Sequence, residues 1–93
     1  MFKDLEFEPN GLGGVGAHHT FENGVTISVQ ASKFNYCTPR ENLPSHSLYA
    51  SFEVALWDDN GWLTRNYFPN INDDVLPMQG REDIDELINK LNK

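Results

Sequence analysis

Two alternations of polar and apolar residues flank Asn23-Gly24, and they constrain the fold more than any other feature of the sequence. A two-residue turn, the type that Asn-Gly favours, would place each apolar residue opposite a polar one. A three-residue loop instead gathers the apolar side chains on one face. Its cross-strand pairs are Phe21 with Val25, His19 with Ile27, Ala17 with Val29 and Val15 with Ala31. We therefore predict a hairpin with a three-residue loop, in which Gly24 takes a positive φ at a G1 bulge.

A second hairpin follows from the strict alternation of residues 48–57. One face of this strand would carry Phe52, Val54 and Leu56. The Asp-Asp-Asn-Gly turn at 58–61 then predicts a return strand over residues 62–68, through a loop of three or four residues. Between the two hairpins the chain has two prolines and many small polar residues. This composition predicts a long surface loop over residues 32–47.

The end of the chain predicts one amphipathic helix. Its apolar stripe, at the spacing i, i+3, i+4 and i+7, consists of Ile84, Leu87, Ile88 and Leu91. In the connector before this helix, the side chains of Val75, Leu76 and Met78 are predicted to pack against the core. The predicted fold is thus a single α+β domain over residues 1–93. It has an antiparallel meander sheet of four strands, or five if the amino-terminal arm joins, with the C-terminal amphipathic helix packed on one face.

The charge of the chain restricts its partners. Fourteen acidic residues and seven basic ones give a formal net charge of −7. This charge opposes attraction to phosphate backbones and to anionic membranes, so we expect neither direct nucleic-acid binding nor membrane binding. Cys37 is the single cysteine, and no long apolar span is present. The simplest expectation is a reducing cytoplasm.

No motif in the sequence indicates catalysis, a metal or a cofactor. His18 and His19 are adjacent, so on a regular strand they point to opposite faces and cannot bind one ion together. Cys37 and His46 on the long loop suggest nucleophilic chemistry, but a small residue packed under a loop is the commoner situation. We therefore predict a protein without enzymatic activity, metal or cofactor.

The face of the second hairpin that one helix cannot also cover is aromatic and acidic. If Phe52 and its neighbours face the helix, the opposite face carries Tyr49, Glu53, Trp57 and, from the return strand, Tyr67. Aromatic residues are enriched at the hot spots of protein interfaces, so this face is predicted to bind a partner. The competing interpretation is a second small core layer, formed by the long loop and the amino-terminal arm folding over that face.

The acidic start of the last helix completes the predicted partner-binding set. The carboxylates of Glu82 and Asp83 would speed association with a basic surface, and salt should weaken this effect. The predicted binding residues are therefore Tyr49, Glu53, Trp57, Tyr67, Glu82 and Asp83.

Three stretches of the chain together resemble a family of small, acidic, uncharacterised tailed-bacteriophage proteins. They are KDLEFEP at the start, GGVGAHHTFENGVTISV in the first hairpin and NDDVLPMQGREDIDELINKL at the end. The resemblance implies a phage or prophage product that acts in the cytoplasm of the bacterial host cell. It further implies binding and blocking of a host protein, host defence nucleases included, and it carries over no catalytic residue.

Two functions from different classes stay open at this point. The first is a phage-encoded, non-enzymatic inhibitor that blocks a host protein, directed at a basic surface such as one that holds nucleic acid. The second is a small phage structural or assembly factor that self-associates through the open sheet face. We expect a monomer or a small homo-oligomer. A monomeric mass in size exclusion would suit the inhibitor, whereas a large closed oligomer would suit the assembly factor.

Overall fold

The first hairpin has the register that the alternation predicts. In the computed structural model, which describes residues 1–92, β2 (Val15–Thr20) runs antiparallel to β3 (Thr26–Ala31). Its pairs include Val15 with Ala31, Ala17 with Val29 and His19 with Ile27. The Phe21 N–H donates to the Val25 carbonyl at 2.8 Å, and the Gly24 N–H donates to the Phe21 carbonyl at 2.9 Å. The three-residue loop is confirmed, and Gly24 has a φ of 88°.

Gly24→Val is expected to lower the free energy of unfolding by about 1 to 3 kcal/mol. No heavy atom lies within 4 Å of the place that a Cβ would take. The expected cost therefore comes from the backbone alone, because β-branched residues rarely adopt a positive φ. Urea denaturation of the variant measures this cost. Gly24→Asn is the matched control and should cost less, since asparagine tolerates a left-handed backbone. Equal stability of Gly24→Val and the parent chain would contradict the strain.

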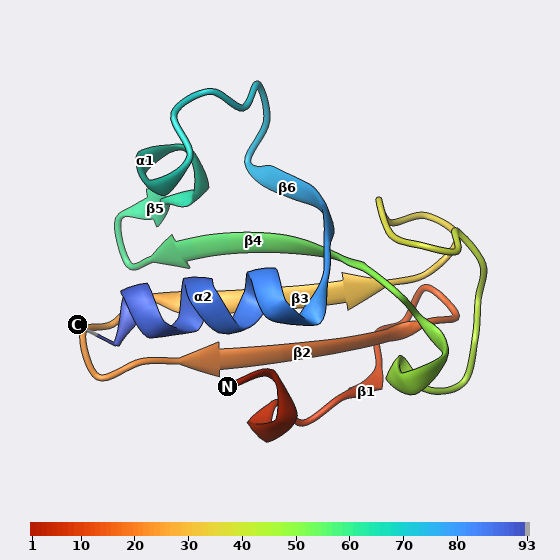
Figure 1. The fold of residues 1–93 in the computed structure, drawn as a ribbon. Helices are drawn as coiled ribbons and strands as arrows, with labels where there is room; N and C mark the ends of the chain where they lie inside the picture. The colour runs from red at the N-terminus through yellow and green to blue at the C-terminus, as the bar shows by residue number, and fades with distance from the viewer. Residues whose placement is uncertain (93) are drawn as a thin grey trace.

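Six strands form one antiparallel sheet (Figure 1). β1 (Glu8–Pro9), β2, β3, β4 (Phe52–Asp58) and β5 (Gly61–Trp62) lie side by side in chain order. β6 (Val75–Gln79) also pairs with β4, so β5 and β6 follow one another along the same edge of β4. The predicted antiparallel α+β fold is confirmed. The sheet has more strands than predicted, because the expected connector before the last helix contains β6.

The predicted return strand over residues 62–68 is wrong beyond its first residue. β5 ends at Trp62, and the short helix α1 (Thr64–Tyr67) follows. The Thr64 hydroxyl accepts a hydrogen bond from the Leu56 N–H at 2.9 Å and donates one to the Leu56 carbonyl at 3.3 Å. This side chain thus takes the place of a strand partner on the edge of β4, so the chain turns away from the sheet.

The turn between β4 and β5 has two residues, Asp59 and Asn60, rather than the three or four that we predicted. The Asn60 N–H donates to a carboxylate oxygen of Asp58 at 2.8 Å, which is a local turn bond typical of aspartate. This register pairs Trp57 directly with Trp62. A cross-strand aromatic pair stabilises a sheet, which favours this register over that of a three-residue loop.

The last helix, α2 (Arg81–Leu91), covers one face of the sheet as predicted (Figure 1). Its whole apolar stripe is buried in the core, against strand residues that include Ile27, Val29, Val54 and Leu56. The Asp83 carboxylate accepts the Gly80 N–H at 2.9 Å and so caps the start of the helix.

The amino-terminal arm lies on the same side of the sheet as α2. It begins with a 3₁₀ helix, η1 (Phe2–Asp4), whose Phe2 side chain is buried in the core. The Phe2 N–H donates to the Asp85 carboxylate at 2.6 Å, and the Phe2 ring centroid lies 5.1 Å from that of Phe52. The arm then adds β1 to the sheet. It therefore completes the single core instead of forming a second layer on the other face.

The long loop also packs into this core. Cys37 and Tyr49 are both buried in it, and a second 3₁₀ turn, η2 (His46–Leu48), precedes Tyr49. Of the three connector residues predicted to pack against the core, Leu76 is buried on the core side, where it pairs with Val54. The prediction is wrong for Met78, because 46 % of its surface is exposed, and for Val75, because it pairs with Ala55 on the opposite face of the sheet.

Candidate functional site

The sheet face opposite α2 carries three rows of side chains. Residues that pair directly across strands share a face, so the strand registers define each row. The rows are Glu8, Gly16, Gln30 and Glu53; then His18, Ser28, Ala55 and Val75; then Thr20, Thr26, Trp57 and Trp62. We call this set the open face. It contains no lysine or arginine, and the buried apolar residues of the arm and of the long loop belong to the core on the other side.

One end of the open face is aromatic. The ring centroids of Trp57 and Trp62 lie 5.6 Å apart at an interplanar angle of 85°. The His18 ring meets Trp57 edge to face at 5.3 Å. Trp62 leaves 56 % of its surface exposed, whereas Trp57 is partly buried. This end therefore offers a rigid apolar surface whose rings hold one another in place.

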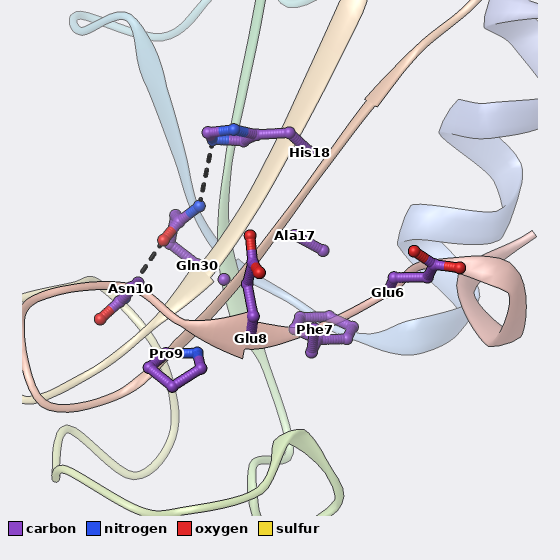
Figure 2. A pocket seen from close by; sticks show the side chains of 9 residues that line it. Glu6, Phe7, Glu8, Pro9, Asn10, Ala17, His18 and Gln30 are labelled. Carbon is purple, nitrogen blue, oxygen red and sulfur yellow. Dashed lines mark hydrogen bonds between the residues drawn. The ribbon is translucent and has the colours of Figure 1, made fainter.

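The other end of the open face is polar and held by a chain of amide hydrogen bonds (Figure 2). The Asn10 amide donates to the Gln30 side-chain oxygen at 3.1 Å. The Gln30 amide donates to the Ser28 hydroxyl at 3.1 Å and meets the His18 ring nitrogen at 3.4 Å. A Cβ at Gly16 would overlap the Gln30 side chain, so this glycine leaves room for it. The polar end is thus preorganised by its own side chains.

Tyr49 does not lie on the open face, contrary to the prediction. It is 1 % exposed, and its hydroxyl donates to the Glu41 carbonyl and accepts the Leu43 N–H at 2.9 Å. The alternation that placed it outside begins only at Phe52, where β4 starts. Tyr49 therefore anchors the long loop and has no exposed surface for a partner.

Tyr49→Phe is expected to lower the free energy of unfolding by about 1 to 3 kcal/mol, because it leaves the Leu43 N–H without its acceptor. Chemical denaturation measures the loss. Tyr67→Phe is the matched control and should change stability little, since Tyr67 is exposed. A loss no larger than that of the control would show that water replaces the hydroxyl at no cost.

The other predicted residues of the second hairpin are divided between two places. Trp57 and Glu53 lie on the open face, and the Glu53 carboxylate accepts the Tyr36 N–H at 2.7 Å. Tyr67 is exposed but lies on α1, beside the edge of β4, and not on a strand of this face. The prediction for its position is wrong because the return strand ends at Trp62.

Glu82 and Asp83 lie on α2, across the sheet from Trp57. Both are exposed, but Asp83 has a structural task as the helix cap. A flat contact on the open face cannot include them. The long-range steering role of Glu82 stays a prediction, and its carboxylate is the better one to test because it caps nothing.

Sequence reasoning missed Trp62 as a member of the site. Trp57 and Trp62 stand at equal distances from the centre of the Asp59-Asn60 turn, so a two-residue loop pairs them. The signal was therefore present in the spacing. It was hidden because a three-residue loop, the other length that we considered, would not align the two rings.

Nucleophilic chemistry at Cys37 finds no support in the geometry. Its sulfur lies 3.2 and 3.3 Å from the Ser32 and Pro39 carbonyl oxygens, either of which can accept the thiol hydrogen, whereas the His46 ring stacks on Phe7. Burial raises the pKa of the Cys37 thiol, which keeps it protonated at neutral pH. His18 and His19 lie on opposite faces, and no group of three or more metal-ligating side chains converges within residues 1–92.

These features define a small α+β domain whose sheet face opposite α2 has an aromatic end and a polar end, with the buried side chains of Ser28 and Ala55 between them. Comparisons with protein-family models, with curated proteins and with solved structures find no match to this chain. In the described part of the chain, no helix has both the length and the apolar character needed to cross a membrane.

Proposed function

We propose that this chain is a non-enzymatic binding protein that uses the open face to block a host protein. One observation carries the proposal: Trp57 and Trp62 lie side by side on a face that neither α2 nor the arm covers. Tryptophan is the residue most enriched at interface hot spots, and exposed apolar clusters mark contact sites on small proteins.

The charge of the open face supports a basic surface on the partner. Glu8 and Glu53 are the acidic side chains of the open face, which has no lysine or arginine, and the whole chain carries a net charge of −7. Opposite charge on the partner would speed association and suppress wrong partners. The resemblance to small acidic phage proteins supports a phage origin, a host protein as the partner and the bacterial cytoplasm as the place of action.

Capture of the partner from host lysate, followed by surface plasmon resonance with the purified partner, tests the proposal. Trp57→Ala is expected to raise the dissociation rate about tenfold or more, the effect typical of a hot-spot tryptophan. Leu48→Ala is the control, because Leu48 is exposed on η2, away from the strands of the open face. If Trp57→Ala keeps its thermal midpoint and its dissociation rate, the open face is not the interface.

An assembly factor that self-associates is the second candidate function. The observation that favours it is the same exposed tryptophan pair, since an aromatic face can also pack against its copy in a symmetric dimer. Light scattering separates the two candidates. A mass above that of one chain that falls to one chain in Trp57→Ala would support self-association, whereas a monomer at all concentrations would support the inhibitor.

A further inference from the structure

We propose that the outer edge of β2, from Ala17 to Thr20, binds an extended basic segment of a partner protein by strand addition. β1 pairs with β2 only at Val15 and Gly16, so the rest of β2 has a strand on one side alone. An unpaired strand edge is a template for a further strand. This edge lies beside the open face and needs neither of its tryptophans.

The hydrogen bonds at the two ends of β2 show which backbone groups are free at this edge. The Phe21 N–H donates to Val25 on the β3 side, whereas the Asn10 N–H donates to Gly14 on the β1 side. In an antiparallel ladder, successive residues direct their N–H and C=O groups alternately to the two neighbours. His18 and Thr20 therefore direct theirs outward. Within residues 1–92 neither residue has a backbone partner on that side.

Two acidic hollows flank this edge. One, of about 540 Å³, is lined by Glu6 and Glu8 of the arm and by residues 16–18 of β2 (Figure 2). The other, of about 660 Å³, is lined by Glu22 and by His19 and Thr20 at the end of β2. Among the described residues, these three carboxylates make no hydrogen bond or ion pair, and no lysine or arginine lines either hollow.

The polar groups of the first hollow select a cation rather than an anion. Both donors of the Asn10 amide are used, by the Val15 carbonyl and by Gln30, each at 3.1 Å. The Gln30 amide donates to the Ser28 hydroxyl and lies 3.4 Å from the His18 ring nitrogen. The Glu8 carboxylate is left for a ligand, and Figure 2 shows it pointing toward the side of the hollow that Gln30 and His18 form. Guanidinium and ammonium groups are its complements.

A second copy of this chain is the competing occupant of the edge. Pairing of two β2 edges would bring together two chains that each carry a net charge of −7. It would also crowd the carboxylates of both arms beside the shared edge, where like charges repel. A basic segment gains from the same carboxylates, so the charge favours it.

Peptide titration of the full chain tests the proposal. The probe is the blocked peptide acetyl-Val-Arg-Val-Arg-Val-amide, and ¹⁵N NMR follows the backbone amides of His18 and Thr20. Two N-methylated forms, one methylated on the arginines and the other on the valines, are the matched controls. Only one set of N–H groups faces β2 in an added strand. One form is therefore expected to bind at least about tenfold more weakly than the parent peptide, and the other within about twofold of it.

Two further variants sharpen the result. Replacing both peptide arginines with glutamate should abolish binding. On the protein, Thr20→Pro removes an outward N–H without touching the ladder with β3, so it should weaken the probe while Thr20→Val does not. Equal effects of the two N-methylated forms would overturn strand addition. A dimer of the free chain that Thr20→Pro dissociates would overturn the basic occupant in favour of a second copy. The peptide titration tests only whether the edge of β2 binds a strand. The dissociation rate of the partner from Trp57→Ala tests the proposed function.

Discussion

Phe52→Ala is expected to lower the free energy of unfolding by about 3 to 5 kcal/mol. The Phe52 side chain is 0 % exposed. The rings of Phe2, Phe7 and Tyr49 surround it, with centroids at 5.1, 5.7 and 6.1 Å. The Arg81 guanidinium lies 5.4 Å from its centroid. Phe52 thus joins the arm, the long loop and the start of α2 to the sheet, so its truncation leaves a cavity that none of these segments can fill alone.

Urea denaturation followed by circular dichroism measures this loss. Phe34→Ala is the matched control, because Phe34 is the same residue type at 61 % exposure. Its effect should stay within about 0.5 kcal/mol. A loss below about 1 kcal/mol in Phe52→Ala would mean that the arm and the loop do not depend on this ring, contrary to the packing seen here.

Gly14→Ala is expected to lower the free energy of unfolding by about 3 kcal/mol, at the upper end of the range for overpacking. A Cβ at Gly14 would overlap the Ala31 carbonyl oxygen and would lie 2.8 Å from the Ser32 Cα. Both are backbone atoms, so relief requires β2 and β3 to separate at the pair that starts the ladder. The close approach of the two chains at this point therefore requires glycine.

Gly16→Ala provides the control for this substitution. Its Cβ would overlap only the Gln30 side chain, whose far end can rotate away. We expect a smaller loss of stability and a changed environment for the Gln30 amide, which NMR detects. Equal unfolding midpoints for the two variants would contradict the distinction between backbone and side-chain obstacles.

The sequence alone was sufficient for the first hairpin and for α2. The apolar alternation around Asn23-Gly24 admits one register that buries its side chains together, and Gly24 supplies the positive φ that this loop requires. The stripe of α2 repeats at the helical period. Both signals lie within a few residues of the structure that they specify, so no distant contact is needed to interpret them.

The edge of β4 could not be predicted in this way. β5, α1 and β6 all lie along it, and the Thr64 side chain replaces a backbone partner there. Which of several short segments pairs with one edge depends on their relative packing. The Asp58-to-Gly61 turn motif is compatible with more than one strand register, and the contact between Trp57 and Trp62 distinguishes these registers only once both rings are in place.

The candidate site also combines residues whose position the sequence alone predicts with residues whose position depends on the tertiary structure. Alternation by itself determined that Trp57 and Glu53 face away from the core, because they lie within the regular part of β4. Only the tertiary structure decided that Tyr49 is buried, since its hydroxyl bonds to Glu41 and Leu43 turn it inward before the strand begins. The free edge at His18 and Thr20 likewise exists because β1 stops short, which reflects the arm packing against Phe52 and α2. Periodicity specifies which side of an element is apolar, whereas the limits and neighbours of that element depend on contacts between residues remote in the chain.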